Sequence, residues 1–291
     1  MEIGLKTTQN KSLLAKEMTA LSIHINSLWI AFVFYNKKKK LIDQRSFAKP
    51  KSNTQLIKSI KKIFKKYKNL NQLNSIFLVY YNTKSTLVPT VLFNKKNLID
   101  YVKYNSIVSV DNLFSFDNVL NRSIKNAYVS SSEINNYIFK KFGSFEYFHY
   151  TTLLIDEFEK YVNSDFNFNF FLNIVDKRLD LICFEKSSFI FYNSFDFSND
   201  EDVLFYTLFC LKQLKIDPEK VFMSCSGEIN LKSSIYILLY KYIRNIEIID
   251  LQENESNNIL FSVKKWASFP VNLGEENLFI QKKSIYDQLQ G

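Results

Sequence analysis

Residues 170–197 read FFLNIVDKRLDLICFEKSSFIFYNSFDF. Short polar turns interrupt the apolar and aromatic residues of this stretch, which predicts three consecutive strands. A helix with leucines along one face is predicted next, at residues 200–215, and a buried strand follows at residues 220–227. This part of the chain therefore predicts three strands, a helix and a fourth strand, in that order.

The same order of elements is predicted a second time, nearer the N-terminus. Residues 21–47 read LSIHINSLWIAFVFYNKKKKLIDQRSF, again as three strands, with a helix at residues 54–68 and a buried strand at residues 75–81. Such a unit, completed by a second helix, is an RNase H-like half-domain (βββαβα). Two of these halves facing a cleft are the plan of the actin, hexokinase and Hsp70 ATPases, so we predict a duplicated α/β fold of that class.

The predicted elements divide the chain into four parts. We expect a flexible N-terminus at residues 1–20 and a first actin-like half with a small insertion at residues 21–165. The second half is expected at residues 166–251, followed by a C-terminal extension at residues 252–291. The polar stretch NSDFNFN at residues 163–169 marks the expected boundary between the halves.

The composition indicates a well-formed core with few phosphate-binding loops. Of the 291 residues, 46% are hydrophobic, but only five are glycine. Few glycines leave few positions where the backbone approaches a phosphate closely. The net charge of +9 is spread along the chain, which favours solvated lysine faces over a dedicated nucleic-acid site.

Several features together predict a cytoplasmic protein. The three cysteines match no zinc or CxxC spacing, and their odd number favours a reducing compartment. The first 18 residues lack the apolar core of a signal peptide. No apolar run approaches the length of a transmembrane segment, about 18 residues.

The hairpin positions that bind phosphate in ATPases of this plan are altered in both halves. Such enzymes carry Asp-x-Gly there, because the carboxylate binds metal or water and the glycine lets backbone N–H groups reach a phosphate. The first half has His24 and Asn26 instead. The second has Asn173 and Val175, with Leu179 where a Thr or Ser often adds a hydroxyl. We therefore predict a degenerate nucleotide site that binds no cofactor and no metal.

Some polar residues near these hairpins still have two interpretations. Gly227 follows a predicted strand where actin-like ATPases have a glycine-rich turn against adenosine, but a strand-ending turn explains it equally well. His24 and Asn173 could hydrogen-bond a small ligand, or serve the sheet alone. The only other histidine, His149, lies among aromatic residues, so neither a catalytic triad nor a multi-histidine metal site is expected.

The predicted helix at residues 54–68 carries a lysine-rich face. Its members are Lys58, Lys61, Lys62, Lys65 and Lys66. Like charges four residues apart on a helix repel by a few tenths of a kcal/mol. This face therefore favours contact with an anionic partner, such as RNA, a membrane surface or an acidic protein. The alternative is the solvated outer face of a crossover helix.

Five stretches of the chain resemble the bacterial domain of unknown function 3822 family. They are TLVP with LF in residues 86–93, LIDYVKYN at 98–105, NYIFKKFGSFE at 136–146, FYNSF at 191–195 and YKYIRN at 240–245. The resemblance implies a place near the PilM and FtsA branch of actin-like ATPases. Members of that branch bind ATP and act as cytoplasmic adaptors for membrane machines.

The residues at the phosphate positions do not fit the ATPase activity of that branch. We therefore predict a pseudo-ATPase: a non-catalytic scaffold or adaptor that binds a protein partner through its cleft or an exposed strand edge. One alternative is an atypical nucleotide-binding ATPase or kinase-like enzyme. Another is an RNA- or ribosome-associated basic protein that binds through its lysine-rich helix.

Overall fold

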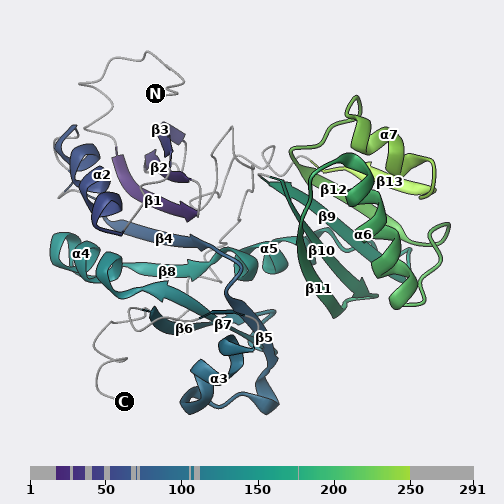
Figure 1. Ribbon diagram of the computed structural model, residues 1–291, viewed down its shortest axis with the longest axis horizontal. Helices are drawn as coiled ribbons and strands as arrows, with labels where there is room; N and C mark the ends of the chain where they lie inside the picture. The colour runs from purple at the N-terminus through teal and green to yellow at the C-terminus, as the bar shows by residue number, and fades with distance from the viewer. Residues whose placement is uncertain are drawn as a thin grey trace. The chain divides into compact units, whose positions relative to one another are not determined.

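The computed structural model describes residues 18–26, 29–36, 41–48, 53–66, 70, 73–104, 106–107, 112–175 and 177–249. The described chain forms two compact units, which divide between Leu154 and Ile155 (Figure 1). The expected flexible N-terminus lies outside the described residues up to residue 17, as does the expected extension at residues 252–291.

The first unit is built on a five-stranded sheet with the order β3-β2-β1-β4-β8. Its strands are β1 (Met18–Asn26), β2 (Trp29–Asn36), β3 (Leu41–Ala48), β4 (Ser75–Tyr81) and β8 (Glu146–His149). The first three form an antiparallel meander, while β4 and β8 run parallel to β1. The meander begins at Met18, three residues before the predicted start.

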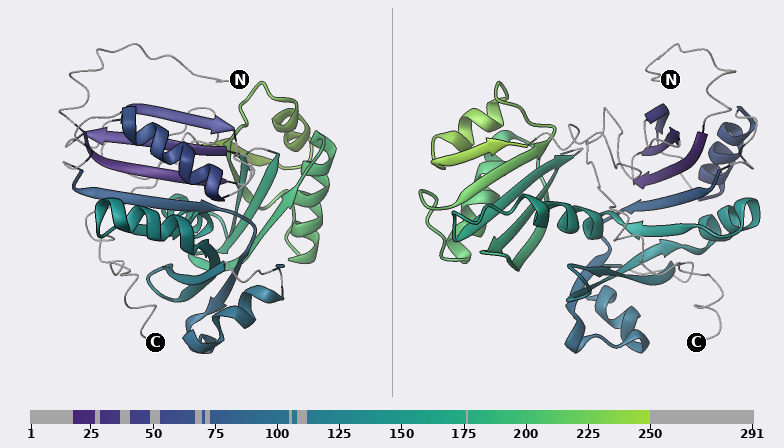
Figure 2. Two further views of the ribbon diagram at one scale, coloured as in Figure 1. Left: turned by 60° about the vertical axis from the view of Figure 1, so that its left-hand side comes forward. Right: turned by 180° about the vertical axis from the view of Figure 1, so that it is seen from behind.

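Two helices cover one face of this sheet, as the left view of Figure 2 shows. They are α2 (Asn53–Lys66) and α4 (Ser132–Phe142). Leu56, Ile60 and Phe64 recur along α2 at helical spacing and enter one hydrophobic core with the strands. The core also receives Ile134 and Ile138 of α4. Amphipathic spacing therefore fixes which side of each helix meets the sheet.

The second unit repeats this arrangement with the strand order β11-β10-β9-β12-β13. Its strands are β9 (Phe168–Val175), β10 (Arg178–Glu185), β11 (Ser188–Asp196), β12 (Phe222–Gly227) and β13 (Asn245–Ile248). Helices α6 (Asp200–Gln213) and α7 (Ser234–Tyr240) pack on one face of this sheet. The strand order and strand directions match those of the first unit, so the predicted duplication is confirmed.

Local hydrogen bonds set the helix ends. The Asn199 side chain accepts from the backbone N–H of Asp202, whose carboxylate accepts from the backbone N–H of Asn199, so a capping box starts α6. Ser233 caps α7 in the same unit. This cap fixes the start of α7, which ends at Tyr240.

The first unit also contains a three-stranded antiparallel sheet with the order β5-β7-β6. Its strands follow β4 and precede α4 along the chain. They are β5 (Ser85–Pro89), β6 (Asn112–Val119) and β7 (Ile124–Ser131). The 3-10 turns η2 (Thr90–Leu92) and η3 (Lys95–Asn97) and helix α3 (Leu98–Lys103) connect β5 toward β6. β5 ends at Pro89, where the chain turns into η2.

Helix α5 (Tyr150–Phe158) and the 3-10 turn η4 (Glu159–Tyr161) lead from β8 to β9. In the second unit, the Phe158 ring stacks on Phe171 of β9, with ring centroids 4.7 Å apart. Phe171 lies on the opposite face of the sheet from α6 and α7, because its neighbours Phe170 and Leu172 belong to the core beneath those helices. The end of the α5–η4 segment therefore packs on the other face of the second sheet.

All three cysteines are free and buried in the second unit. Cys183 lies on β10, Cys210 on α6 and Cys225 on β12, and all belong to the core beneath the helices. Burial raises the pKa of the Cys183 thiol to about 12 and that of Cys210 to about 11. Burial also raises the pKa of Cys225. These side chains therefore serve as small core residues.

Gly227 ends β12 in a conformation that other residues rarely adopt. Its φ is +86°, and a Cβ atom there would lie 2.1 Å from the backbone oxygen of Ile174. That same oxygen accepts a hydrogen bond from the backbone N–H of Glu228 at 2.8 Å. The glycine therefore allows the ends of β12 and β9 to approach closely.

We predict that Gly227→Ala destabilises the protein by about 3 kcal/mol or more, because backbone strain of 1–3 kcal/mol adds to the clash with Ile174. Urea unfolding followed by circular dichroism measures this loss. Gly143→Ala is the matched control, since φ is +77° there but a Cβ atom would meet nothing within 4 Å. Equal losses of unfolding free energy in the two variants would show that the close approach of Gly227 to Ile174 does not matter for stability.

Candidate functional site

His24 lies within β1, between Ala31 of β2 and Val79 of β4. Its side chain is fully buried, with Nε2 2.8 Å from the Ser22 hydroxyl and Nδ1 3.3 Å from the Tyr81 hydroxyl. Burial lowers the pKa of His24 to about 3. The imidazole is therefore neutral near pH 7, and its two ring nitrogens lie beside the hydroxyl groups of Ser22 and Tyr81.

Asn26 is the last residue of β1 and pairs with Tyr81 of β4. It is half-buried, so the carboxyl end of the first strand carries a neutral amide where an ATPase of this plan has glycine. His24 and Asn26 point to the same face of the sheet, because side chains two residues apart on a strand share a face. No formal charge stands at either position.

In the second unit, Asn173 and Gly227 lie together at the end of β9 and β12. The Asn173 Oδ1 accepts a hydrogen bond from the Ser226 hydroxyl at 3.0 Å, while its Nδ2 has no partner among the described residues. Asn173 is fully buried, and Val175 is 3% exposed. The end of β9, which carries Asn173 and Val175, and the turn at Gly227 are therefore neighbours in the fold.

Leu179 faces away from this group. It pairs with Ile174 across β9 and β10, and both side chains belong to the core beneath α6 and α7. Since strand side chains alternate between faces, Leu179 and Asn173 lie on opposite sides of the sheet. The position expected to carry a phosphate-binding hydroxyl therefore contributes an apolar group to the core.

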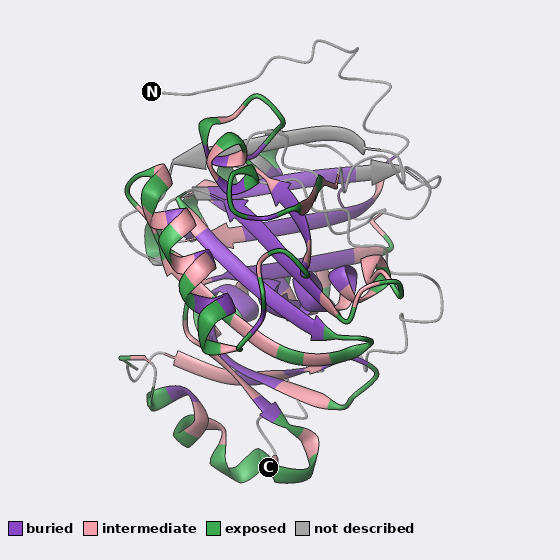
Figure 3. Ribbon diagram, turned by 90° about the vertical axis from the view of Figure 1, so that its right-hand side faces the viewer, coloured by how far each residue is buried: buried purple, intermediate pink, exposed green. Residues whose placement is uncertain are grey.

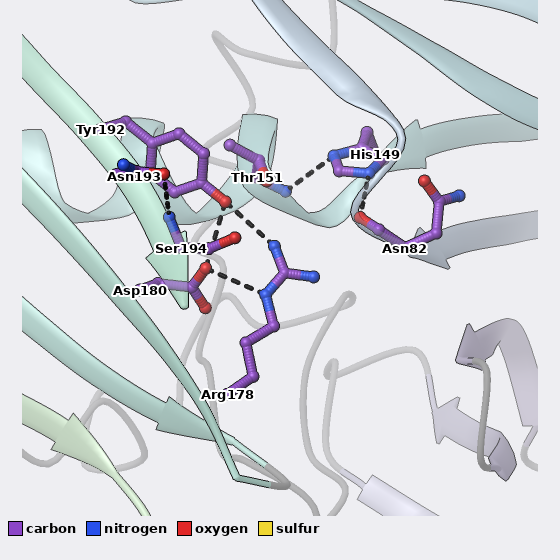
Figure 4. Close-up of polar contacts among 8 residues, drawn as sticks. All are labelled: Asn82, His149, Thr151, Arg178, Asp180, Tyr192, Asn193 and Ser194. Atoms are coloured by element: carbon purple, nitrogen blue, oxygen red, sulfur yellow. Dashed lines mark hydrogen bonds and ion pairs between the residues drawn. The ribbon is translucent and has the colours of Figure 1, made fainter. Parts of the chain in front are cut away.

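An ion pair beside Asn173 was not singled out in the sequence. Asp180 of β10 is directly opposite Asn173 in the strand register, and it is fully buried. Its Oδ1 accepts from Arg178 Nε at 3.2 Å and from the Tyr192 hydroxyl at 3.1 Å, and the guanidinium also donates to Tyr192 at 3.1 Å (Figure 4). The signal was available, because Arg and Asp two residues apart on a strand share a face.

This arrangement restricts the chemistry of Asp180. A metal ion or a reacting proton requires free carboxylate lone pairs, but here one oxygen already accepts two hydrogen bonds, one of them charge-assisted. The ion pair also balances the charge of the buried carboxylate. Arg178, Asp180 and Tyr192 therefore form a charge-compensated, hydrogen-bonded group next to the altered hairpin, in which Oδ1 of Asp180 is already engaged.

A second buried polar group occupies the first unit, around Asp117 of β6. Its carboxylate accepts from the Tyr128 hydroxyl at 3.0 Å, the His149 backbone N–H at 2.8 Å and the Thr152 hydroxyl at 2.9 Å. These partners come from β7, β8 and α5. The group therefore ties the three-stranded sheet to the end of the larger sheet. Sequence reasoning missed it, because its members are far apart in the chain.

The role of His149 follows from its neighbours. Its Nε2 lies 2.9 Å from the backbone oxygen of Asn82, which only accepts, so Nε2 carries the proton (Figure 4). Nδ1 then accepts from the Thr151 backbone N–H at 3.3 Å and from Asn126 Nδ2 at 3.3 Å. This neutral tautomer uses both ring nitrogens within the unit, which agrees with a structural role.

The lysine-rich face of α2 is exposed at Lys58, Lys61, Lys62 and Lys65, while the side chain of Lys66 lies outside the described residues. Lys61 Nζ lies 5.4 Å from the centre of the Tyr137 ring on α4, within the range of a cation–π contact. The lysine-rich face of α2 thus remains a candidate site for an anionic partner, although Lys61 is directed onto α4.

Two kinds of site have no representative in the described part of the chain. No three His, Cys, Asp or Glu side chains gather there in a way that could hold a metal ion. Nor does any of the helices described above have the length and apolar character needed to cross a membrane.

Burial of His24 predicts a pH dependence of stability. Unfolding returns the pKa of this imidazole from about 3 to 6.5, so the unfolded chain takes up a proton that the folded chain excludes. The contribution to stability is complete above pH 6.5 and is lost as the pH falls toward 3, by at most about 1.4 kcal/mol per pH unit. His24→Gln should abolish it.

Urea unfolding of the wild type and of His24→Gln, at about pH 7 and about pH 5, measures this difference. The wild type should lose roughly 2 kcal/mol more than the variant over that interval. Carboxylate titration is common to both proteins and cancels in the comparison. The same pH dependence in both would show that His24 is accessible to protons in the folded state.

The fold of this chain is similar to those of several solved structures. The chain resembles a protein of Bacteroides thetaiotaomicron with an actin-like ATPase fold and unknown function, at 19% identity and a TM-score of 0.67, over 87% of this chain and 96% of that one. This similarity and the duplicated sheets establish the actin-like ATPase fold.

More distant similarities extend to two other groups. The PilM–PilN type IV pilus biogenesis complex gives 12% identity and a TM-score of 0.48, over 79% of this chain and 88% of that one. A Ppx/GppA phosphatase of Aquifex aeolicus gives 12% identity and a TM-score of 0.35, over 72% and 67%. No curated protein matches the sequence. The family model described as Protein of unknown function (DUF3822) matches residues 8–246, so the chain belongs to that family.

Proposed function

We propose that this member of the DUF3822 family is a non-catalytic scaffold or adaptor that binds a protein partner in the cytoplasm. The observation that carries the proposal is the character of the hairpin positions. His24 and Asn173 are buried and uncharged, and Val175 and Leu179 are buried and apolar. A phosphate needs cations, a metal or converging backbone N–H donors, and these side chains supply none of them.

The hydrogen bonds of two buried carboxylates support the same proposal. Oδ1 of Asp180, opposite Asn173, accepts from Arg178 and Tyr192, and Asp117 in the first unit accepts three hydrogen bonds. Phosphoryl transfer requires a group that holds Mg²⁺ or orients a nucleophile. If either carboxylate bound Mg²⁺ or a nucleophile instead, its present hydrogen bonds would be lost. Each buried donor left without an acceptor would cost about 1–3 kcal/mol of stability.

The connection between β5 and β6 carries exposed apolar side chains that suit a protein partner. We name it the α3 surface, after the helix at its centre. Five large apolar side chains are exposed there, with Val91 at 91% and Tyr104 at 83%. Its members are Val91, Leu92, Ile99, Tyr104 and Ile107. Several exposed apolar side chains within one short stretch of chain are a feature of protein–protein contact sites.

The absence of nucleotide binding is testable by thermal melting. We expect Mg-ATP, Mg-ADP and Mg-GTP at millimolar concentration to leave the melting temperature unchanged. A nucleotide at 100 times its Kd would stabilise the folded protein by about 2.7 kcal/mol, which is readily detected. A rise that Asn173→Ala removes would instead favour nucleotide binding at the second hairpin, and the pseudo-ATPase proposal would be withdrawn.

The partner-binding part is tested by affinity purification of the tagged full chain from cells that produce it. A specific protein should co-purify, and the pair Val91→Ser and Leu92→Ser should reduce its recovery at least tenfold. Lys58→Ser with Lys62→Ser is the matched control on exposed residues of α2. Loss of the partner only in this control would assign binding to the lysine-rich face, and recovery of no specific protein would contradict the adaptor proposal.

A further inference from the structure

The outer face of α6 carries two exposed aromatic rings in a row. Phe205 is 61% exposed and Phe209 is 45% exposed. Their rings stack with centroids 5.9 Å apart and planes 20° from parallel, since residues four apart on a helix are neighbours. Neither ring enters the core beneath α6. This side of the second unit faces the viewer in Figure 3, where helix positions on the outer face are green.

Opposite charges flank the two rings on the same helical face. Glu201 stands one turn before Phe205, and Lys212 stands about one turn after Phe209. Both side chains are exposed. In the described residues, neither Glu201 nor Lys212 forms an ion pair. The stripe therefore reads acidic, aromatic, aromatic, basic along the helix.

Helix α7, which packs on the same face of the sheet as α6, also exposes apolar side chains. Ile237 is 52% exposed and Tyr240 is 60% exposed, and the two lie three residues apart on one face of the helix. A hydrogen bond from the Ser234 hydroxyl to Asp200 joins the N-terminal ends of α7 and α6. We refer to Glu201, Phe205, Phe209, Lys212, Ile237 and Tyr240 together as the α6–α7 surface.

We infer that the α6–α7 surface binds a second copy of this chain, with the two α6 helices antiparallel. The argument is charge complementarity. Rotation by 180° places the acidic end of one stripe against the basic end of the other, so Glu201 meets Lys212 of the second copy twice. Phe205 then meets Phe209 of the second copy at the centre. An interface that repeats the same patch on both copies is the usual form of a two-fold dimer.

This pairing is independent of the proposed function. The surface proposed for a protein partner belongs to the connection between β5 and β6, in the other unit. A failure of the partner-binding test would therefore leave the dimer inference unaffected, and the reverse also holds. The dimer also differs from general hydrophobic association, because it requires the charges at the two ends of the stripe to be opposite.

The test is sedimentation equilibrium of the full chain and of charge-reversed variants. We expect the wild type to dimerise, and Glu201→Lys or Lys212→Glu to raise the dissociation constant at least tenfold, since each places like charges together twice. An equimolar mixture of these two variants should recover dimerisation, because all of its charge pairs are again opposite. The double variant Glu201→Lys with Lys212→Glu should also dimerise.

Two controls separate the interface from folding. Glu185→Lys changes an exposed charge at the end of β10, away from the stripe, and should leave the dissociation constant unchanged. Circular dichroism melting shows whether each variant is folded. Phe205→Ser should abolish the dimer without unfolding the chain, because that ring is largely exposed.

Three results would overturn the inference. The first is a wild type that stays monomeric up to roughly 0.1 mM, a concentration at which a micromolar contact would be saturated. The second is a dimer that folded Phe205→Ser leaves intact. The third is a dimer weakened by each single charge reversal but not recovered in the mixture, since that would exclude the antiparallel arrangement.

Discussion

The rest of each unit depends on one constraint, a parallel strand that returns beside the first strand of the meander. A parallel return needs a crossover, which here is α2 in the first unit and α6 in the second. The crossover helix covers one face of the sheet, and the other face receives the remaining side chains, which include Asn173 and the ring of Phe171. Strand alternation then assigns every residue to a face, which is why Leu179 enters the core while Asn173 joins Ser226. The hairpin residues are thus altered although both units keep the same strand order.

The sequence allowed the framework to be predicted because its signals are local. Apolar runs, polar turns and helical spacing all lie within short windows, and they indicate the repeated order of elements. Gly227 also stands out in the sequence, although only the structure reveals that Ile174 leaves no room for a side chain there. The sequence indicated only a small insertion where the three-stranded sheet lies, because strands such as β5 are short and β5 ends at a proline.

The candidate site was predicted less completely, for a physical reason. The hairpin positions follow from spacing along one strand, but buried polar groups form between distant segments. Asp117 gathers donors from three other elements, and no short pattern in the sequence brings them together. Arg178 and Asp180 were within reach of a simple rule, since they are two residues apart on a predicted strand. Their third member, Tyr192, comes from the next strand, so the hydrogen-bonded group appears only once β10 and β11 are paired.

The three buried cysteines have a practical consequence for studying this protein. Thiol reagents attack the thiolate, and burial keeps all three side chains protonated at neutral pH. A cysteine introduced at an exposed position would therefore react first, without removal of the native ones. Single fluorophores could then be attached to either unit, so that distances and rotational motions of the two units are observed in solution. The packing of one sheet thus makes the whole molecule accessible to site-specific labelling.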